Sequence, residues 1–172
     1  YFLETHSSIN RPPRVDLRKA DGQFVRAVSQ ADISRLHALD WTPGEPFVVK
    51  DANGDREIQG VLYKPANFDA SRKYPLIQFI HQSGRFHLQR GFIPDGYNLT
   101  AQAFAQLGFV TFVARKTYKE SDGWDPERGF AGTATADSQA VIRQLQALKP
   151  FIDSNRVGVY GSSMNGFYSI LS

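Results

Sequence analysis

The sequence predicts an α/β fold, in which a mostly parallel sheet opens with an antiparallel hairpin and follows a short antiparallel β segment. From residue 47 onwards, short apolar runs alternate with helical stretches, which is typical of strand–helix–strand units with parallel crossovers. Before residue 41, closely spaced apolar runs are separated by turn residues, a pattern that favours antiparallel strands. The chain has 172 residues, of which 41% are hydrophobic, so it is long enough for one ordinary domain with its own core.

Residues 1–40 are expected to form the antiparallel segment and a connector. The run 1–5 is typical of a strand, and the polar run 7–13 is typical of a loop. Asp21 and Gly22 then stand between two further apolar runs. This arrangement predicts a hairpin, because glycine accepts the positive φ that a tight turn requires.

The next two stretches of sequence indicate a connector and then a domain boundary. Residues 32–39 fit one short amphipathic helix, and the segment 41–46 combines Pro and Gly in a way that is typical of a linker. We therefore divide the chain into a β segment with its connector, residues 1–40, and a larger unit, residues 41–172.

The larger unit contains the alternating elements. Five strands are predicted, at residues 47–49, 58–63, 76–80, 109–114 and 157–160. The turn sequence Asp51-Ala-Asn-Gly54 joins the first two strands as a hairpin. One helix is predicted at residues 100–107, before Gly108, and a second at about residues 133–148, before Pro150.

Composition excludes several classes of function. The net charge is only +3, and Lys and Arg are interleaved with acidic residues, which favours a solvated surface over a nucleic-acid interface. No apolar run approaches the length of a membrane span. The absence of cysteine excludes disulfides, thiolate metal sites and cysteine nucleophiles, and it leaves cytoplasmic, periplasmic and secreted locations open.

The most informative stretch is Arg-Val-Gly-Val-Tyr-Gly-Ser-Ser-Met-Asn-Gly-Phe, residues 156–167. It has the layout of a nucleophile elbow, in which a strand turns sharply into a helix and holds a serine oxygen clear of the backbone. Gly161 stands two residues before Ser163, which makes Ser163 rather than Ser162 the candidate nucleophile. An ordinary Gly/Ser turn between a strand and a helix is the alternative interpretation.

One position departs from the usual elbow pattern. The glycine expected two residues after the serine is Asn165. Asn tolerates unusual φ values better than most residues, and the adjacent Gly166 supplies further freedom. The substitution therefore predicts altered or reduced activity rather than loss of the elbow.

Three passages of the chain resemble one known family. Lys64-Pro-Ala-Asn-Phe-Asp-Ala-Ser-Arg-Lys-Tyr-Pro75 is similar to the passage that opens the catalytic domain of prolyl oligopeptidase-type serine peptidases, the dipeptidyl peptidase branch included. Residues 151–167 resemble the approach of that family to its nucleophile, where G-x-S-x-G-G-[YF] is usual. Residues 5–16 are similar to the end of the β-propeller that precedes the catalytic domain.

The resemblance implies a partial α/β-hydrolase fold behind the end of a β-propeller, and cleavage of peptides by acyl transfer without a cofactor or metal. In such enzymes the triad runs Ser, then Asp, then His along the chain, so both partners of Ser163 would come from sequence beyond residue 172. We therefore expect a piece of a longer protein. Alone it would be inactive and prone to associate with itself or with its missing carboxyl-terminal half.

The oxyanion hole of this family supplies two further candidates. One donor would be the backbone N–H of Met164, directly after the nucleophile. The resemblance implies a second donor from the loop after the third strand, where the family uses a Tyr hydroxyl. Counting from Tyr74-Pro75 places His81 there. An imidazole N–H can donate a hydrogen bond, and a purely structural histidine is equally compatible with the sequence.

Two weaker motifs have ordinary explanations. His81 and His87 lack a nearby carboxylate cluster in the sequence, so we predict no metal site there. Asn98-Leu-Thr100 fits a glycosylation acceptor, and helix N-capping explains it equally well.

Three functions remain open from the residues and the resemblance together. The favoured one is a serine hydrolase that acts on peptides or on small amide and ester substrates. A non-catalytic homologue used for binding or assembly is motivated by Asn165, by His81 and by the lack of the Asp-x-Arg-Gly segment that the family often shows. An esterase on the same fold would use the same residues.

Overall fold

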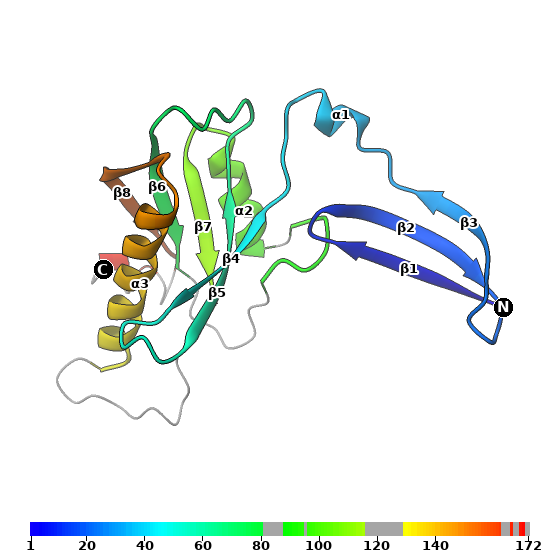
Figure 1. The fold of residues 1–172 in the computed structure, drawn as a ribbon, viewed down its shortest axis with the longest axis horizontal. Coiled ribbons are helices and arrows are strands. Elements are labelled where there is room, and N and C mark those ends of the chain that lie inside the picture. The colour runs from blue at the N-terminus through cyan, green and yellow to red at the C-terminus, as the bar shows by residue number, and fades with distance from the viewer. Residues whose placement is uncertain (81–87, 95, 116–128, 163–165, 167–168, 171–172) are drawn as a thin grey trace.

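The computed structural model describes residues 1–80, 88–94, 96–115, 129–162, 166, 169 and 170, and it contains two separate sheets. A small three-stranded sheet extends to one side of a five-stranded sheet, and the amino terminus lies at its far end (Figure 1). The small sheet consists of β1 (Phe2–Ser8), β2 (Arg11–Arg18) and β3 (Phe24–Gln30). The larger one consists of β4 (Glu45–Lys50), β5 (Glu57–Tyr63), β6 (Tyr74–Phe79), β7 (Val110–Ala114) and β8 (Ile152–Tyr160).

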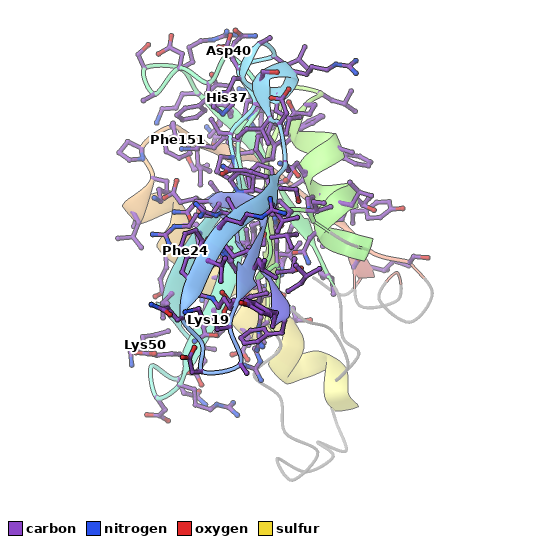
Figure 2. The ribbon with its side chains drawn as sticks, turned by 90° about the vertical axis from the view of Figure 1, so that its right-hand side faces the viewer. Lys19, Phe24, His37, Asp40, Lys50 and Phe151 are labelled. Atoms are coloured by element: carbon purple, nitrogen blue, oxygen red, sulfur yellow. The ribbon has the colours of Figure 1, made fainter. Side chains whose placement is uncertain are left out.

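The small sheet is antiparallel throughout, as predicted. The turn between β2 and β3 contains Gly22 with a φ of 89°, which confirms the hairpin. The prediction of a loop over residues 7–13 was wrong. β2 already begins at Arg11 and includes two prolines. The prolines are tolerated because they precede the first residue pair between β2 and β3, so no N–H is needed from them. Phe24 lies at the exposed start of β3 (Figure 2).

The connector contains a helix that is shorter than the sequence predicts. α1 (Ser34–His37) has one turn and no buried residue, so the amphipathic helix expected over residues 32–39 was only partly right. The carboxylate of Asp32 accepts the backbone N–H of Ser34 over 2.9 Å, which fixes the start of the turn.

The larger sheet is mixed, with the strand order β4-β5-β7-β6-β8. β4 and β5 form the predicted hairpin, whose turn contains Gly54 with a φ of 81°. β7 pairs antiparallel with β5 and parallel with β6, and β6 pairs parallel with β8. The hairpin and the two parallel crossovers expected from the sequence are thereby confirmed.

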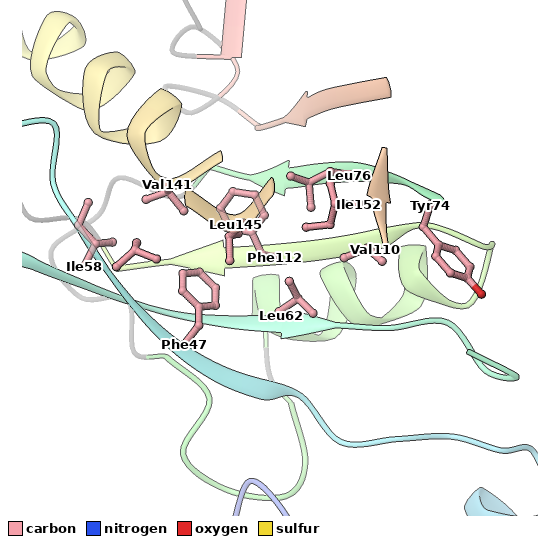
Figure 3. Packing of buried hydrophobic residues seen from close by; sticks show 11 residues of the cluster. Phe47, Ile58, Leu62, Tyr74, Leu76, Val110, Phe112, Val141, Leu145 and Ile152 are labelled. Carbon is pink, nitrogen blue, oxygen red and sulfur yellow. The ribbon is translucent and has the colours of Figure 1, made fainter. Parts of the chain in front are cut away.

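Helices cover both faces of the larger sheet. α3 (Gly129–Leu148) packs on one face through Val141 and Leu145, which lie against Phe112 and Leu76 of the sheet (Figure 3). α2 (Gly96–Ala105) covers the other face through Ala101 and Ala105. Burial of one large apolar side chain of this kind contributes roughly 1.5–3 kcal/mol, so the two layers stabilise the sheet.

Polar contacts fix α3 relative to the hairpin. The side-chain amide of Gln144 accepts the backbone N–H of Lys50 over 2.9 Å and donates to its carbonyl oxygen over 2.7 Å. About two helical turns before Gln144, the carboxylate of Asp137 accepts the backbone N–H of Ala52 over 3.1 Å. α3 is therefore held in register with the sheet that leads to the candidate site. No described helix is both long and apolar enough to cross a membrane.

Candidate active site

Two strands of the larger sheet end side by side, and each leads into a segment that contains a predicted site residue. β6 and β8 run parallel with Phe79 paired to Tyr160. One step further, the N–H of Ile80 donates to the carbonyl oxygen of Tyr160 over 2.9 Å. His81 follows Ile80 directly, and Gly161 follows Tyr160. The carboxyl ends of neighbouring parallel strands are where α/β folds place their ligand sites.

Gly166 lies close to Gly161, the residue that follows β8. A Cβ added to Gly166 would stand 3.2 Å from the carbonyl oxygen of Gly161, so the chain returns to the strand end within five residues. Gly166, Ser169 and Ile170 are helical. The described part of this stretch therefore has the strand, close approach and helix of an elbow. The predicted residues Ser163, Met164 and Asn165, and also His81 and His87, lie outside the described residues.

The close approach gives glycine a physical role at position 166. The distance of 3.2 Å to a backbone oxygen is shorter than an ordinary carbon–oxygen contact, and a backbone atom yields less readily than a flexible side chain. The requirement for a small residue is thus visible at Gly166, next to the unusual Asn165.

A buried polar pair lies one residue before the end of β6. The side-chain amide of Gln78 donates to the hydroxyl of Ser138 in α3 over 2.9 Å, and both residues are buried. Within the part of the chain that the structure describes, Gln78 Oε1 has no hydrogen-bond partner. The pair ties the middle of α3 to the strand that leads to His81, a connection between distant residues that sequence reasoning missed.

A second polar network lies under the opposite face, between β5 and α2. The hydroxyl of Tyr63 donates to Gln89 Oε1 over 2.8 Å and lies 3.1 Å from Asn98 Oδ1. Asn98 is fully buried inside α2, so glycosylation of the folded chain at this residue is excluded. The capping interpretation was wrong as well, because α2 already begins at Gly96.

One group of possible metal ligands occurs among the described residues, on the small sheet. Oxygen and nitrogen atoms of Glu4, His6 and Asp16 lie within 4.8 Å of one another. The two carboxylates already accept hydrogen bonds from guanidinium groups: Arg14 lies 2.7 Å from Asp16, and Arg18 lies 2.6 Å from Glu4. The group is therefore an ion-pair ladder across β1 and β2 rather than a ready cation site.

Hydrogen bonding in this ladder lowers the pKa of one carboxyl group, that of Asp16. The hydrogen bond from Arg14 lowers the pKa of Asp16 below its usual range, and the contact with His6 over 3.2 Å acts in the same direction. Asp16 is thus held as a carboxylate. His6 takes part in this ladder through its contact with Asp16.

Comparison with known proteins identifies the chain's relatives. No protein-family model matches the chain. It is 28% identical to human dipeptidyl peptidase 8 over 137 residues, which cover 77% of the chain and 15% of that protein. It is 25% identical to dipeptidyl-peptidase 5 of Porphyromonas endodontalis over 158 residues, 90% of the chain and 22% of that protein. The chain is therefore similar to dipeptidyl peptidases over most of its length.

A solved structure supports the same fold. Porphyromonas gingivalis dipeptidyl peptidase 4 superimposes with a TM-score of 0.67 and 20% identity over 99% of the chain and 24% of that protein. The expected fold, an antiparallel β segment ahead of a partial α/β-hydrolase sheet, is thereby confirmed. The chain spans less than a quarter of the length of each of these three proteins.

Proposed function

We propose that this chain carries the nucleophile of a serine peptidase of the prolyl oligopeptidase type. Residues 1–40 would form the end of a propeller and its connector, and residues 41–172 the amino-terminal part of the catalytic domain. The observation that carries the proposal is the close approach of Gly166 to Gly161 beside the end of β6. A turn of this kind presents a serine hydroxyl to a base and to oxyanion donors at once.

The proposed reaction is acyl transfer. Ser163 Oγ attacks the scissile carbonyl carbon while a histidine takes its proton, and the carbonyl oxygen becomes the oxyanion. The N–H of Met164 and the imidazole of His81 would donate to that oxygen. The C–N bond then breaks, and the histidine returns the proton to the leaving amine. Water releases the acyl group in a second step, with the histidine and its aspartate supplied by sequence beyond residue 172.

The substrate class follows from the relatives. Two of them are named as dipeptidyl peptidases, so we propose peptides as substrates and release of an amino-terminal dipeptide as the reaction. No cofactor takes part in this chemistry. Small amides and esters are alternative substrates for the same residues, and an exclusive preference for esters would turn the proposal into the esterase interpretation.

Hydrolysis by the full-length protein tests the proposal. Dipeptide p-nitroanilides, N-acylated amino acid p-nitroanilides and p-nitrophenyl esters are compared, with the Ser163→Ala variant and its neighbour Ser162→Ala as a matched control. We expect cleavage of dipeptide anilides that Ser163→Ala lowers by about 10⁴-fold or more, because the nucleophile is lost. Ser162→Ala should stay within about tenfold of the wild type. A folded wild-type protein that cleaves none of these compounds would favour the non-catalytic homologue.

A further inference from the structure

The small sheet, residues 1–30, meets the rest of the chain at one end. The turn between β1 and β2 points towards the larger sheet beside the segment 88–94, and the amino terminus lies at the far end (Figure 1). β3 leads into the connector, residues 31–40, whose side chains are exposed except for half-buried Ile33 and Leu36. The connector therefore contributes little packing, and the contacts that orient the small sheet lie at the turn between β1 and β2.

Ile9 forms the apolar contact of this turn. Its half-buried side chain packs against the cluster that contains Val61 and Tyr63 of β5. Gly44 of the linker lies at the same place, since a Cβ at this position would stand 2.5 Å from Val61 and 3.3 Å from Ile9. Apolar contact is not directional, so it holds the turn against β5 but does not by itself fix the rotation of the sheet about Ile9.

Ser7 forms the polar contact of the same turn. Its Oγ accepts the backbone N–H of Phe92 over 3.0 Å and donates to the carbonyl oxygen of Arg11 over 3.0 Å. Among the described residues, the contact with Phe92 is the one hydrogen bond that joins the small sheet to the larger unit. A hydrogen bond weakens steeply as its angle departs from linearity, so this contact depends on the orientation of the sheet.

Phe92 is itself held firmly on the larger unit. Its carbonyl oxygen accepts a hydrogen bond from Gln89 Nε2 over 2.9 Å, and Gln89 Oε1 accepts the hydroxyl hydrogen of Tyr63 over 2.8 Å. Phe92 is buried, and its ring lies 5.2 Å from the ring of Trp41 in the linker. Buried polar networks rigidify the structure around them when their members are hydrogen-bonded. The N–H that Ser7 accepts is therefore a fixed point of the larger unit.

We propose that the Ser7–Phe92 hydrogen bond is a latch that fixes the orientation of the small sheet, with Ile9 as the pivot. One directional contact and one apolar contact together define an orientation that the apolar contact alone does not define. Units of one chain move relative to each other by default unless their interface is large and apolar. The proposal goes beyond the proposed function, because it concerns the arrangement of the two sheets and holds with or without peptidase activity.

A hydrogen bond that only adds stability predicts a different result. Its loss lowers the free energy of unfolding, and every molecule that remains folded keeps the same arrangement of the two sheets. Loss of a latch instead lets folded molecules sample several orientations, so the distance between two points on the two sheets becomes less uniform.

Distances between two spin labels on the full-length protein measure this arrangement. The labels are introduced as unnatural amino acids at Lys19, which follows β2, and at Lys50, which ends β4; both side chains are exposed (Figure 2). β2 has 8 residues, so Lys19 lies about 25 Å from the turn at Ile9. A rotation of about 10° about Ile9 therefore moves Lys19 by about 4 Å, which pulsed electron paramagnetic resonance detects.

Three variants of the turn separate the latch from other effects. Ser7→Ala removes the acceptor of the Phe92 N–H, Ser7→Thr retains a hydroxyl, and Ser8→Ala is the matched control, whose hydroxyl donates to Asn10. We expect Ser7→Ala to broaden the distance distribution by about 4 Å or more, and Ser7→Thr and Ser8→Ala to keep the wild-type distribution. Hydrogen exchange at the Phe92 amide should be about two- to tenfold faster in Ser7→Ala than in Ser8→Ala, because one hydrogen bond contributes roughly that factor.

Each outcome decides for or against the latch. A wild-type distance distribution in Ser7→Ala would overturn it, whether or not hydrogen exchange at Phe92 becomes faster. Equal broadening in Ser7→Ala and Ser8→Ala would overturn it as well, because the effect would not depend on the contact with Phe92. Ile9→Ala keeps the hydroxyl of Ser7 and should shift the mean distance; an unchanged mean would overturn the pivot. The measurement needs no substrate, so failure of the proposed function would leave its result unchanged.

Discussion

The backbone N–H of Ile80 donates a hydrogen bond to the carbonyl oxygen of Tyr160 over 2.9 Å. Ile80 directly follows β6, and Tyr160 is the last residue of β8, so the two are 80 positions apart in the sequence. The contact brings together the starting points of the segments that follow Ile80 and Tyr160. From the sequence, only the family resemblance suggests that these two segments belong to one site. The next residues along the chain are His81 and Gly161, so the proposed oxyanion donor and the proposed nucleophile turn leave from adjacent positions.

Substitution of Gly166 tests the tightness of the elbow. The Cβ of an alanine would stand 3.2 Å from the carbonyl oxygen of Gly161, so the turn must open. We expect Gly166→Ala to slow acylation of the full-length protein by about tenfold, because small displacements of a nucleophile are costly. Gly158→Ala is the control, since its Cβ would meet Ile77 at an ordinary 3.9 Å. Equal rates in Gly166→Ala and the wild type would contradict a tight turn.

His81 gives a test of the oxyanion hole. If its imidazole donates to the oxyanion, His81→Ala should lower kcat by about 10²-fold with a small change in KM. His81→Tyr installs the hydroxyl that the family uses and should retain more activity than His81→Ala. Steady-state kinetics on a dipeptide anilide measures both. Equal kcat values for the wild type and His81→Ala would show that the donor is another group.

Gly60 tests the packing of the hairpin on the larger sheet. A Cβ at this position in β5 would lie 2.1 Å from the ring of Phe47, which is paired opposite it on β4. We expect Gly60→Ala to lower the free energy of unfolding by about 1–3 kcal/mol, because the ring must move within a packed core. Urea unfolding measures the loss, with Gly158→Ala as the comparison. Equal stability of the two variants would contradict this packing.

The pH dependence of the small sheet tests the ladder of Asp16. Its pKa is lower in the folded chain than in the unfolded one, so the stabilising contribution is fully present above the unfolded pKa of about 3.9. The contribution is lost as the pH falls through the folded value. Asp16→Asn should therefore be less stable than the wild type near neutral pH, and the difference should shrink under strongly acidic conditions. Thermal unfolding across this range measures it, and a difference that grows on acidification would contradict the ladder.

Local patterns predicted most of the fold. Gly22 and Gly54 both have the positive φ that the hairpins require, and Gly108 has a φ of 97° after α2. These residues signal their turns by themselves, because few other residues adopt that backbone conformation. The apolar runs predicted each strand of the larger sheet, because a run of apolar residues bounded by turn residues is itself a local signal of a buried strand.

Contacts between distant residues were not predictable from one sequence. Ile9 was expected to lie in a polar loop, yet its side chain packs on the larger sheet. Gln89 carried no motif, and its role depends on Tyr63, 26 residues earlier in the chain. Asn98 resembled a surface acceptor because a triplet does not reveal which face of a helix is buried. At the predicted elbow, the sequence suggested Ser163 as the nucleophile, which stays a prediction, whereas the contact of Gly166 with Gly161 needed the folded chain.

The central claim is that Ser163 is the nucleophile of a serine peptidase, and mapping of a covalent adduct tests it most directly. The full-length protein is treated with a fluorophosphonate, digested, and analysed by tandem mass spectrometry across the peptide that contains Ser162 and Ser163. We predict a single adduct on Ser163, which is absent after denaturation before labelling and absent in Ser163→Ala. An adduct on Ser162, or no adduct in correctly folded protein, would contradict the claim.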